Sequence, residues 1–395
     1  MRFLHISDLH IGKVVNDFSM LEDQRFILEQ ITGIAKANRA EAVVIAGDIY
    51  DRAIPSGEAV MLFDQFLTEL SAWGIQVLLV SGNHDSPERI SFGKQLLGRQ
   101  GVHVAGVQEE ELEIVEFREP EPGSVRKEIV TQFVLLPFLK PAWMDAATCG
   151  EAVEKALKGY WEKEKRVGKR KKNRVLVTHF FVTDSGKEPE LSDSETTVHV
   201  GGLDNVDASV FAGFDYTALG HIHKPQQIGE YPVWYAGSPL KYSFGEAKQE
   251  KCALLVEMGQ GRLKGVQAVP LHPLKEMRKI YGSLKELLDQ GQEDPGKYDY
   301  IQANLTDQGE LIDPIGTLRS VYPNVMQIVR QTEDQELDSL EFETSRSRHL
   351  AEKRDVLALF EDFYQEVKGE TLSDSGREIV EKLVKELEGQ EGIKA

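Results

Sequence analysis

Short apolar runs alternate with longer segments of helical period from the start of the chain to about Pro270. This alternation is expected where strands are covered by helices. Two amphipathic helices are predicted between the first three strands, because apolar residues recur there at helical spacing. Their apolar faces are Leu21, Leu28, Ile31 and Ala35 in one, and Leu62, Phe66 and Leu70 in the other. The predicted strands are residues 2–7, 42–46, 75–80, 133–137, 175–178, 216–220 and 233–236. The pattern indicates an α/β fold for residues 1–270.

A second, smaller α/β unit is predicted over residues 271–332. Strand-like segments at 277–282, 299–306 and 324–329 are separated there by the helix-compatible segments 283–290 and 312–322. The change in the pattern of strand-like and helix-like segments near Pro270 predicts a domain boundary.

The composition changes again at about residue 333. Residues 333–395 carry 18 acidic and 9 basic side chains. Two amphipathic helices are predicted within this segment, at 352–368 and 376–388. Their apolar stripes could pack against each other or the core, or form a docking arm for a partner.

Composition narrows the class of protein. The chain has 395 residues and a formal net charge of −19, so its surface repels nucleic acid and anionic lipid unless metal ions or a basic partner intervene. Two distant cysteines, Cys149 and Cys252, exclude a disulfide framework and a thiolate zinc site, which fits a cytoplasmic location. The sequence pattern predicts neither a signal peptide nor a membrane-spanning stretch. A basic run at residues 163–174 is either a solvated loop or a guide for a phosphate backbone.

Candidate metal ligands follow five of the predicted strands. In open α/β sheets the carboxyl ends of strands gather ligands, so these groups can converge although they are far apart in sequence. In an extended segment residues i and i+2 face the same side, which pairs Asp8 with His10 and His221 with His223. The seven candidates are Asp8, His10, Asp48, Asn83, His179, His221 and His223.

Glycines precede several of these donors. At Gly47, Gly82 and Gly220 we expect a positive φ and the missing Cβ to allow sharp turns that aim the next side chains. If Asp48 bridges, each of two metal ions would receive four protein ligands, with water and substrate completing the coordination. Five other histidines are interpreted as structural: His5, which lies within a strand, and His103, His199, His272 and His349, which lack a ligand-bearing partner at useful spacing.

The motifs resemble a known family. The series D-x-H, G-D, G-N-H-D, H and G-H-x-H is the pattern of calcineurin-like metallophosphoesterases. Five longer segments are similar, more narrowly, to the SbcD family of bacterial nuclease subunits. They are FLHISDLHIGK, AGDIYDRAIPS, VSGNHDSPERI, LGHIHKPQ and YAGSPLKYSFGE. The resemblance implies a metallophosphoesterase β-sandwich flanked by helices at 1–270, a capping and DNA-binding domain at 271–332, and a helical partner-docking segment at 333–395.

The resemblance also implies roles for individual residues. One metal ion would be held by Asp8, His10, Asp48 and His223, and a second by Asp48, Asn83, His179 and His221. His84 would assist the reaction without belonging to the ligand set. Some archaeal relatives have a histidine at the position of Asp51, so no substrate role is carried over to that residue. We expect the segments 184–202 and 237–246 to line the substrate path, with Lys224, Ser238, Lys241 and Tyr242 as substrate-binding residues.

Three functions are compatible with these observations. The resemblance implies a nuclease subunit with 3′–5′ exonuclease activity on duplex DNA and endonuclease activity on single strands. It would work with two Mn²⁺ ions and an SbcC-type ATPase, in an assembly with two copies of each subunit, and a homodimer of the chain is a further expectation. The alternative is a free-standing phosphoesterase for nucleotides or phosphoproteins, which the acidic charge favours. A non-catalytic scaffold would predict lost ligands, and none is lost. The ligand chemistry alone is compatible with manganese, iron or zinc.

Overall fold

The computed structural model describes residues 1–120, 128–167, 172–192, 204–259 and 261–330, together with residues 376, 377 and 380. The chain divides into two compact units, Met1–Val329 and Arg330–Ala395. The first unit contains every strand described below except for Arg330, the final residue of the last strand. The predicted helix 352–368, and all of 376–388 except residues 376, 377 and 380, lie outside the described residues.

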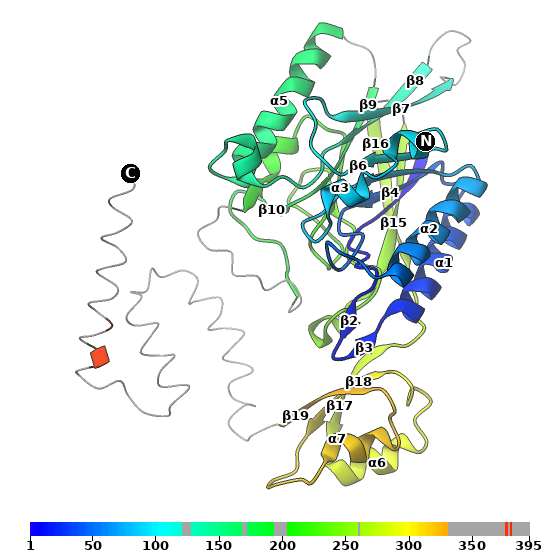
Figure 1. The fold of residues 1–395 in the computed structure, drawn as a ribbon, viewed down its shortest axis with the longest axis vertical. Coiled ribbons are helices and arrows are strands. Elements are labelled where there is room, and N and C mark those ends of the chain that lie inside the picture. The colour runs from blue at the N-terminus through cyan, green and yellow to red at the C-terminus, as the bar shows by residue number, and fades with distance from the viewer. Residues whose placement is uncertain are drawn as a thin grey trace. The chain divides into compact units, whose positions relative to one another are not determined.

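Two six-stranded sheets form the centre of the first unit (Figure 1). The first has the order β16 (Arg262–Pro270), β15 (Cys252–Gly259), β1 (Arg2–Ile6), β4 (Ala42–Ala46), β5 (Gln76–Val80) and β6 (Val102–Ala105). The second has the order β13 (Gln226–Gln227), β14 (Val233–Tyr235), β12 (Tyr216–Gly220), β9 (Lys172–His179), β8 (Glu128–Leu135) and β7 (Glu113–Pro120). In each sheet four consecutive strands are parallel, and antiparallel strands lie toward the edges.

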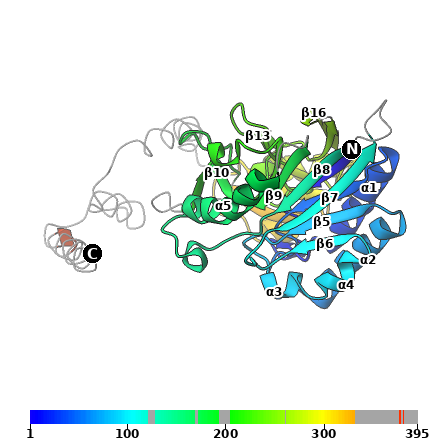
Figure 2. The ribbon, with the colours of Figure 1, turned by 90° about the horizontal axis from the view of Figure 1, so that it is seen from above.

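Helices cover the outer faces of both sheets. Helices α1 (Leu21–Ala37) and α2 (Gly57–Ala72) pack their apolar faces on the first sheet, and α5 (Cys149–Val167) packs on the second. Figure 2 shows α1 and α2 on the opposite side of the strands from α5. A third apolar cluster, which includes Phe3, Phe133 and Tyr216, fills the space between the sheets. The predicted β-sandwich flanked by helices is therefore confirmed.

The sequence pattern located most of the central strands. Strands β4 and β12 have the predicted bounds, and the predicted apolar faces of α1 and α2 are buried except for Leu21, which packs against the core while partly exposed. Of the strands in the two sheets, β6, β7, β13, β15 and β16 were not predicted. Strand β16 has no fully buried residue, and its partly buried positions do not alternate with exposed ones as in a typical strand.

A three-stranded sheet follows the sandwich within the first unit. Its order is β17 (Met277–Gly282), β18 (Tyr300–Leu305) and β19 (Val325–Arg330), and β17 and β18 are parallel. Helices α6 (Leu284–Gly291) and α7 (Pro314–Arg319) complete a separate apolar cluster. This matches the small α/β unit expected there, while the domain boundaries at 270 and 332 stay predictions.

Short elements complete the described chain. Their bounds are β2 (Val14–Val15), β3 (Phe18–Ser19), α3 (Pro87–Ile90), α4 (Lys94–Gly98), β10 (Phe181–Thr183), β11 (Asn205–Asp207) and the 3₁₀ turns Pro141–Met144, Ala208–Phe211 and Phe244–Glu246. Among the described residues, no helix has the length and apolarity needed to cross a membrane.

Candidate metal centre

The seven predicted donors meet at the carboxyl ends of the parallel strands. Asp8 and His10 follow β1, Asp48 follows β4 and Asn83 follows β5, all in the first sheet. His179 ends β9 and His221 and His223 follow β12 in the second sheet. The site is therefore built from both layers of the sandwich, as the strand-end rule for α/β folds predicts.

Four of these residues adopt a left-handed backbone conformation. The φ angles are 52° at Asp8, 44° at His10, 49° at Asp48 and 105° at His221. Residues other than glycine rarely adopt positive φ, and such strain is concentrated at functional sites. The surrounding hydrogen bonds maintain it: the Asp8 amide donates to the Gly47 carbonyl, at 3.1 Å, and the His221 amide donates to Asp8 Oδ1, at 3.0 Å.

Glycines leave room for the donors. Gly47 has a φ of +84°, as predicted, and a Cβ there would lie 2.4 Å from the His179 ring. Gly220 needs no positive φ, and neither does Gly82, so that part of the expectation is wrong for both. What Gly220 supplies is space, because a Cβ would lie 1.9 Å from the Ala46 carbonyl oxygen.

Asp8, His10 and His223 form the first group that could hold a metal ion. The Nε2 atoms of His10 and His223 lie 3.2 Å apart. All three side chains are buried, and the ligand atoms lie within 4.8 Å of one another.

His179, His221 and Asn83 converge beside this group. His179 Nε2 lies 3.0 Å from Asn83 Oδ1, and His221 Nδ1 lies 3.1 Å from the same oxygen. The other ring nitrogen of His179 lies 2.8 Å from the Ala46 carbonyl oxygen, so Nε2 is directed into the site.

Asp48 lies between the two sets. Its Oδ2 is 3.4 Å from His179 Nε2 and 3.8 Å from His10 Nε2, and its Oδ1 accepts a 2.9 Å hydrogen bond from the His84 amide. This position between one histidine of each predicted set is what the proposed bridging role requires.

The electrostatics of the metal-free site reflect burial and close charges. Burial raises the pKa of Asp8 to about 6, despite the opposing effect of His179. Burial would also raise the pKa of Asp48. The nearby imidazole rings of His179, His10 and His84 have the opposite effect, which is stronger, and they hold the pKa of Asp48 below its usual range. Burial alone would lower the pKa of His179, and the charge of Asp48 raises it to about 9. Opposite charges are thus held close together on the buried side chains of Asp8, Asp48 and His179.

His84 lies at the rim of the group. Its side chain is 43% exposed, and Nδ1 lies 3.0 Å from the Asp51 carbonyl oxygen. Its Nε2 lies 3.9 Å from Asp48 Oδ2, and its ring meets that of His10 edge-on, with centroids 4.9 Å apart. His10, Asp48 and His84 also satisfy the distances of a metal group. The assignment of His84 to catalysis therefore stays a prediction.

The four predicted substrate-binding residues differ in accessibility. Ser238 and Tyr242 are buried; Ser238 donates to the Leu240 carbonyl, at 2.7 Å, and Tyr242 to the Leu9 carbonyl, at 2.5 Å. Lys241 pairs with Glu276, at 2.6 Å, and Lys224 with Glu190. Each side chain is engaged with the protein itself, and a role in substrate binding stays a prediction for all four.

Three basic residues in the described part of the basic run are paired with acids. Lys163 pairs with Glu111, while Lys172 and Arg174 pair with Glu164, at 2.9 and 3.0 Å. Residues 168–171 lie outside the described part of the chain. Both ends of the run are thus engaged with acidic side chains of the protein itself, which argues against a phosphate-guiding role for these three residues.

Sequence reasoning missed residues that support the site. Asp85 is buried and accepts hydrogen bonds from the amides of Ile49, Tyr50 and Gly82, at 2.9–3.1 Å, which ties the loops after β4 and β5 together. Gln24 of α1 donates to the His10 carbonyl, at 2.8 Å. Asp85 ends the G-N-H-D motif and could have been suspected, whereas Gln24 looks in the sequence like any helical polar residue.

The donor set fits divalent metal ions. Carboxylate oxygens, an amide oxygen and imidazole nitrogens suit borderline and hard divalent cations. The two Nε2 atoms directed at each other from His10 and His223, beside Asp8, form the kind of convergence expected of ligands. The residues present could therefore hold the predicted ions.

Comparison with known proteins decides the family. Residues 1–225, more than half of the chain, match the family model of calcineurin-like phosphoesterases. The chain belongs to the calcineurin-like phosphoesterase family. Residues 272–368 match a second model, described as the Type 5 capsule protein repressor C-terminal domain and labelled SbcD_C. The expectation of a metal-dependent phosphoesterase is thereby confirmed, and family membership implies divalent metal ions.

Two relatives of this calcineurin-like phosphoesterase match over nearly their whole length. Both are named as the SbcD component of the nuclease SbcCD. The protein from Staphylococcus epidermidis is 28% identical over 398 residues, covering 99% of this chain and 100% of the relative. That from Staphylococcus saprophyticus is 29% identical, covering 98% of each. Among solved structures, a dimetal phosphatase from Danio rerio is 14% identical with a TM-score of 0.41, covering 69% of this chain and 98% of that one. The predicted resemblance to SbcD is confirmed.

Proposed function

We propose that this chain is the Mn²⁺-dependent nuclease subunit of an ATP-dependent complex that processes DNA ends and hairpins. The observation that carries the proposal is the meeting of seven suitable donors in one site of a chain that matches two SbcD proteins from end to end. The proposed activities are 3′–5′ exonuclease on duplex DNA and endonuclease on single strands.

The residues divide into two proposed ligand sets. Asp8, His10 and His223 would hold one ion and Asn83, His179 and His221 the other, with Asp48 shared. Two such ions, when bound, supply an activated water and positive charge that offsets the charge growing on the phosphoryl oxygens. The contacts of the Asp8 amide with the Gly47 carbonyl, and of the His179 ring with the Ala46 carbonyl, hold the donors in place before substrate arrives.

His84 is the proposed proton donor. The Asp51 carbonyl beside Nδ1 leaves Nε2 directed toward the site, and the half-exposed ring can reach a phosphodiester at the rim. From that position it would protonate the departing 3′ oxygen or stabilise charge on the phosphoryl group.

A free-standing phosphoesterase acting on nucleotides or phosphoproteins is the alternative. The net charge of −19 favours it, because a long polyanion is repelled by such a surface. The match of residues 272–368 to a second family model argues against it, since a small-molecule phosphatase does not need that additional segment.

The proposed partner is an SbcC-type ATPase that supplies cationic surface, with two copies of each subunit in the assembly. Two copies of this chain could meet through an exposed apolar patch. Phe92, between α3 and α4, is 85% exposed, and Leu96 in α4 is 68% exposed. A patch of large exposed apolar side chains often marks a surface that binds another protein.

The test compares DNA with small phosphoesters. We expect the purified chain with Mn²⁺ to release nucleotides from linear duplex DNA, and the Asp48→Ala variant to lose this activity. Addition of the ATPase subunit with ATP should extend cleavage to hairpins. Turnover of nucleotides or bis(p-nitrophenyl) phosphate without any cleavage of DNA, even with the ATPase present, would instead establish the alternative.

A further inference from the structure

A buried ion pair lies directly behind one of the metal-site histidines. Glu246 is fully buried and Lys251 is 5% exposed, and Lys251 Nζ lies 2.5 Å from Glu246 Oε2. Neither residue belongs to the seven donors. Charges this deeply buried are costly unless they are paired and hydrogen-bonded, so the surroundings of the pair indicate what it does.

The pair contacts His223 at two points. Glu246 Oε1 lies 3.5 Å from His223 Nδ1, on the side of the ring away from the metal group. Lys251 Nζ donates to the His223 carbonyl oxygen, at 2.9 Å, and the Ser238 amide donates to the same oxygen, at 3.1 Å. Both the ring and the backbone of this histidine are thereby held.

The other contacts of the pair hold the surrounding loop. Lys251 donates to Ser238 Oγ, at 2.9 Å, and to Gln249 Oε1, at 3.0 Å. Glu246 Oε1 accepts from Ser243 Oγ, at 3.3 Å, and from the Tyr242 amide, at 3.4 Å. The ring of Tyr242 in turn meets the rings of His10 and His223 edge-on. The pair is thus fixed by five residues and cannot easily adopt another arrangement.

We infer that Glu246 and Lys251 are positioning residues for His223. A carboxylate that accepts a hydrogen bond from the protonated Nδ1 fixes the tautomer in which the Nε2 lone pair faces the metal, and it makes the ring a stronger ligand. Lys251 balances the charge of Glu246 and holds the His223 carbonyl, so the ring cannot rotate away when no ion is bound. The inference rests on the proposed metal site but not on DNA as the substrate.

The same network includes two of the four predicted substrate-binding residues, Ser238 and Tyr242. Their contacts run to Lys251 and Glu246. Their polar groups therefore support the ligand His223 from within the protein.

The test measures metal binding separately from activity. Mn²⁺ is titrated into the full-length chain and the free ion is followed by electron paramagnetic resonance. We expect wild-type protein to bind two ions and Glu246→Gln to lose about 10- to 100-fold in affinity for one of them, the range typical of partners of ligating histidines. Turnover of bis(p-nitrophenyl) phosphate should then need more Mn²⁺ for half-saturation and recover at high Mn²⁺.

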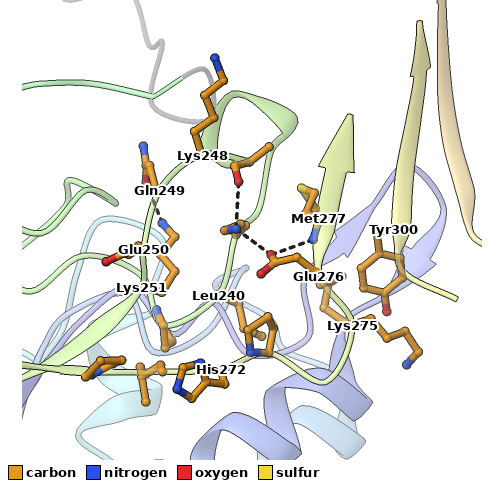
Figure 3. Close-up of a pocket in the computed structure, with 17 residues that line it drawn as sticks. Leu240, Lys248, Gln249, Glu250, Lys251, His272, Lys275, Glu276, Met277 and Tyr300 are labelled. Atoms are coloured by element: carbon orange, nitrogen blue, oxygen red, sulfur yellow. Dashed lines mark hydrogen bonds and ion pairs between the residues drawn. The ribbon is translucent and has the colours of Figure 1, made fainter. Parts of the chain in front are cut away.

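Removal of one member leaves a buried charge unpaired, so the double variant Glu246→Gln/Lys251→Met is included. It removes both charges together and should show the same loss of Mn²⁺ affinity. The matched controls are Glu250→Gln and Lys248→Met, which make the same changes at exposed positions of the same loop. Figure 3 shows the Lys248 side chain pointing away from Glu276 and Met277. Both controls should bind two ions as wild type does.

Either of two results would overturn the inference. One is a folded double variant with both Mn²⁺ affinities unchanged, which would make the pair a purely structural ion pair. The other comes from nuclear magnetic resonance of wild-type protein that is loaded with Zn²⁺ and labelled with ¹⁵N-histidine. It tests the tautomer of His223 even if the Glu246 and Lys251 variants fail to fold. We expect the His223 resonances, assigned by their loss in His223→Gln, to show a protonated Nδ1; ligation through Nδ1 would contradict the inference. Wild-type protein that binds fewer than two ions would instead refute the proposed two-metal site.

Discussion

The hydroxyl of Tyr300 in β18 donates a 2.7 Å hydrogen bond to the buried carboxylate of Asp23 in α1. The same carboxylate accepts from the Lys275 amide, at 3.2 Å. The next residue, Gln24, donates to the carbonyl of His10. The first turn of α1 thus contacts the three-stranded sheet with one side chain and the candidate metal site with the next.

We predict that Tyr300→Phe lowers the free energy of unfolding by about 1.5 to 3 kcal/mol, the range for a hydrogen bond to a charged group. Urea denaturation measures the change. Tyr281→Phe, at a side chain that is 56% exposed, is the control and should be neutral. Equal stability of the two variants would mean that water replaces the lost bond and that the contact does not hold the sheet to α1.

His84→Gln should lower kcat for DNA cleavage by about 10²- to 10⁴-fold, the usual contribution of general acid catalysis. Metal stoichiometry and DNA affinity should stay as in wild type, because the residue lies at the rim of the donors. Elemental analysis and a binding titration check both. If the variant retains only one ion, His84 is a metal ligand, as its closeness to His10 and Asp48 also allows.

His5 should make the metal-free protein less stable in acid. Burial lowers its pKa to about 3, and the ring contacts Tyr216 Oη and the Leu219 carbonyl oxygen, at 2.9 and 3.1 Å. The unfolded chain takes up the proton near pH 6.5 and the folded protein only near pH 3, so this stability is complete above about 6.5 and is lost as pH falls.

The slope approaches about 1.4 kcal/mol per pH unit between those values. Denaturation of wild type and His5→Gln in chelator, from pH 4 to 7, measures the contribution. Parallel curves for the two proteins would show that His5 does not titrate in this way. Its burial in β1 agrees with the structural interpretation of this histidine.

Phe92→Asp/Leu96→Asp should convert a dimer of the chain into monomers. Two carboxylates in an apolar contact would remain unpaired on burial, which disfavours association. Light scattering after gel filtration should give the 44.4 kDa chain mass for the variant and twice that for wild type. Ile312→Asp, at a side chain that is 94% exposed, is the control and should remain dimeric. A monomeric wild type would exclude the proposed patch.

Deletion of residues 340–395 should abolish association with the ATPase subunit and leave metal-dependent cleavage of simple DNA intact. The apolar stripes predicted at 352–368 and 376–388 would otherwise dock in a groove of the partner. Co-purification and thermal unfolding of the truncated chain separate the two interpretations of this segment. A truncated protein that still co-elutes with the ATPase, or one whose phosphoesterase unit unfolds at a much lower temperature, contradicts docking.

The sequence was most informative where burial constrains both faces of a strand. Strands β4 and β12 lie in the middle of their sheets and are buried throughout, so their uninterrupted apolar residues gave the right bounds. In strand β7 the exposed positions include Ile114 and the partly buried ones include Glu113 and Glu119, so apolar and charged residues occur on both faces, and β16 is largely exposed. At such edges packing does not dictate the side chains, and the pattern that identifies strands is lost.

The donors could be found from the sequence because ligand chemistry restricts each position to a few residue types at strand ends. Their supporting residues could not. Glu246 and Lys251 are charged residues in an acidic chain, and nothing local indicates that they are buried together behind His223. Only the three-dimensional structure reveals which carboxylate lies behind which histidine.

The division of the donors between two sheets makes the site a joint between the layers of the sandwich. Asp8 and Asp48 belong to one layer and His179 and His223 to the other. Each of the two proposed ions would therefore have ligands from both sheets and tie the two layers together. Metal binding would then stabilise the folded state by an amount that grows with the logarithm of the ratio of ion concentration to dissociation constant. A cell short of the metal would hold a protein that is not only inactive but also easier to open and degrade.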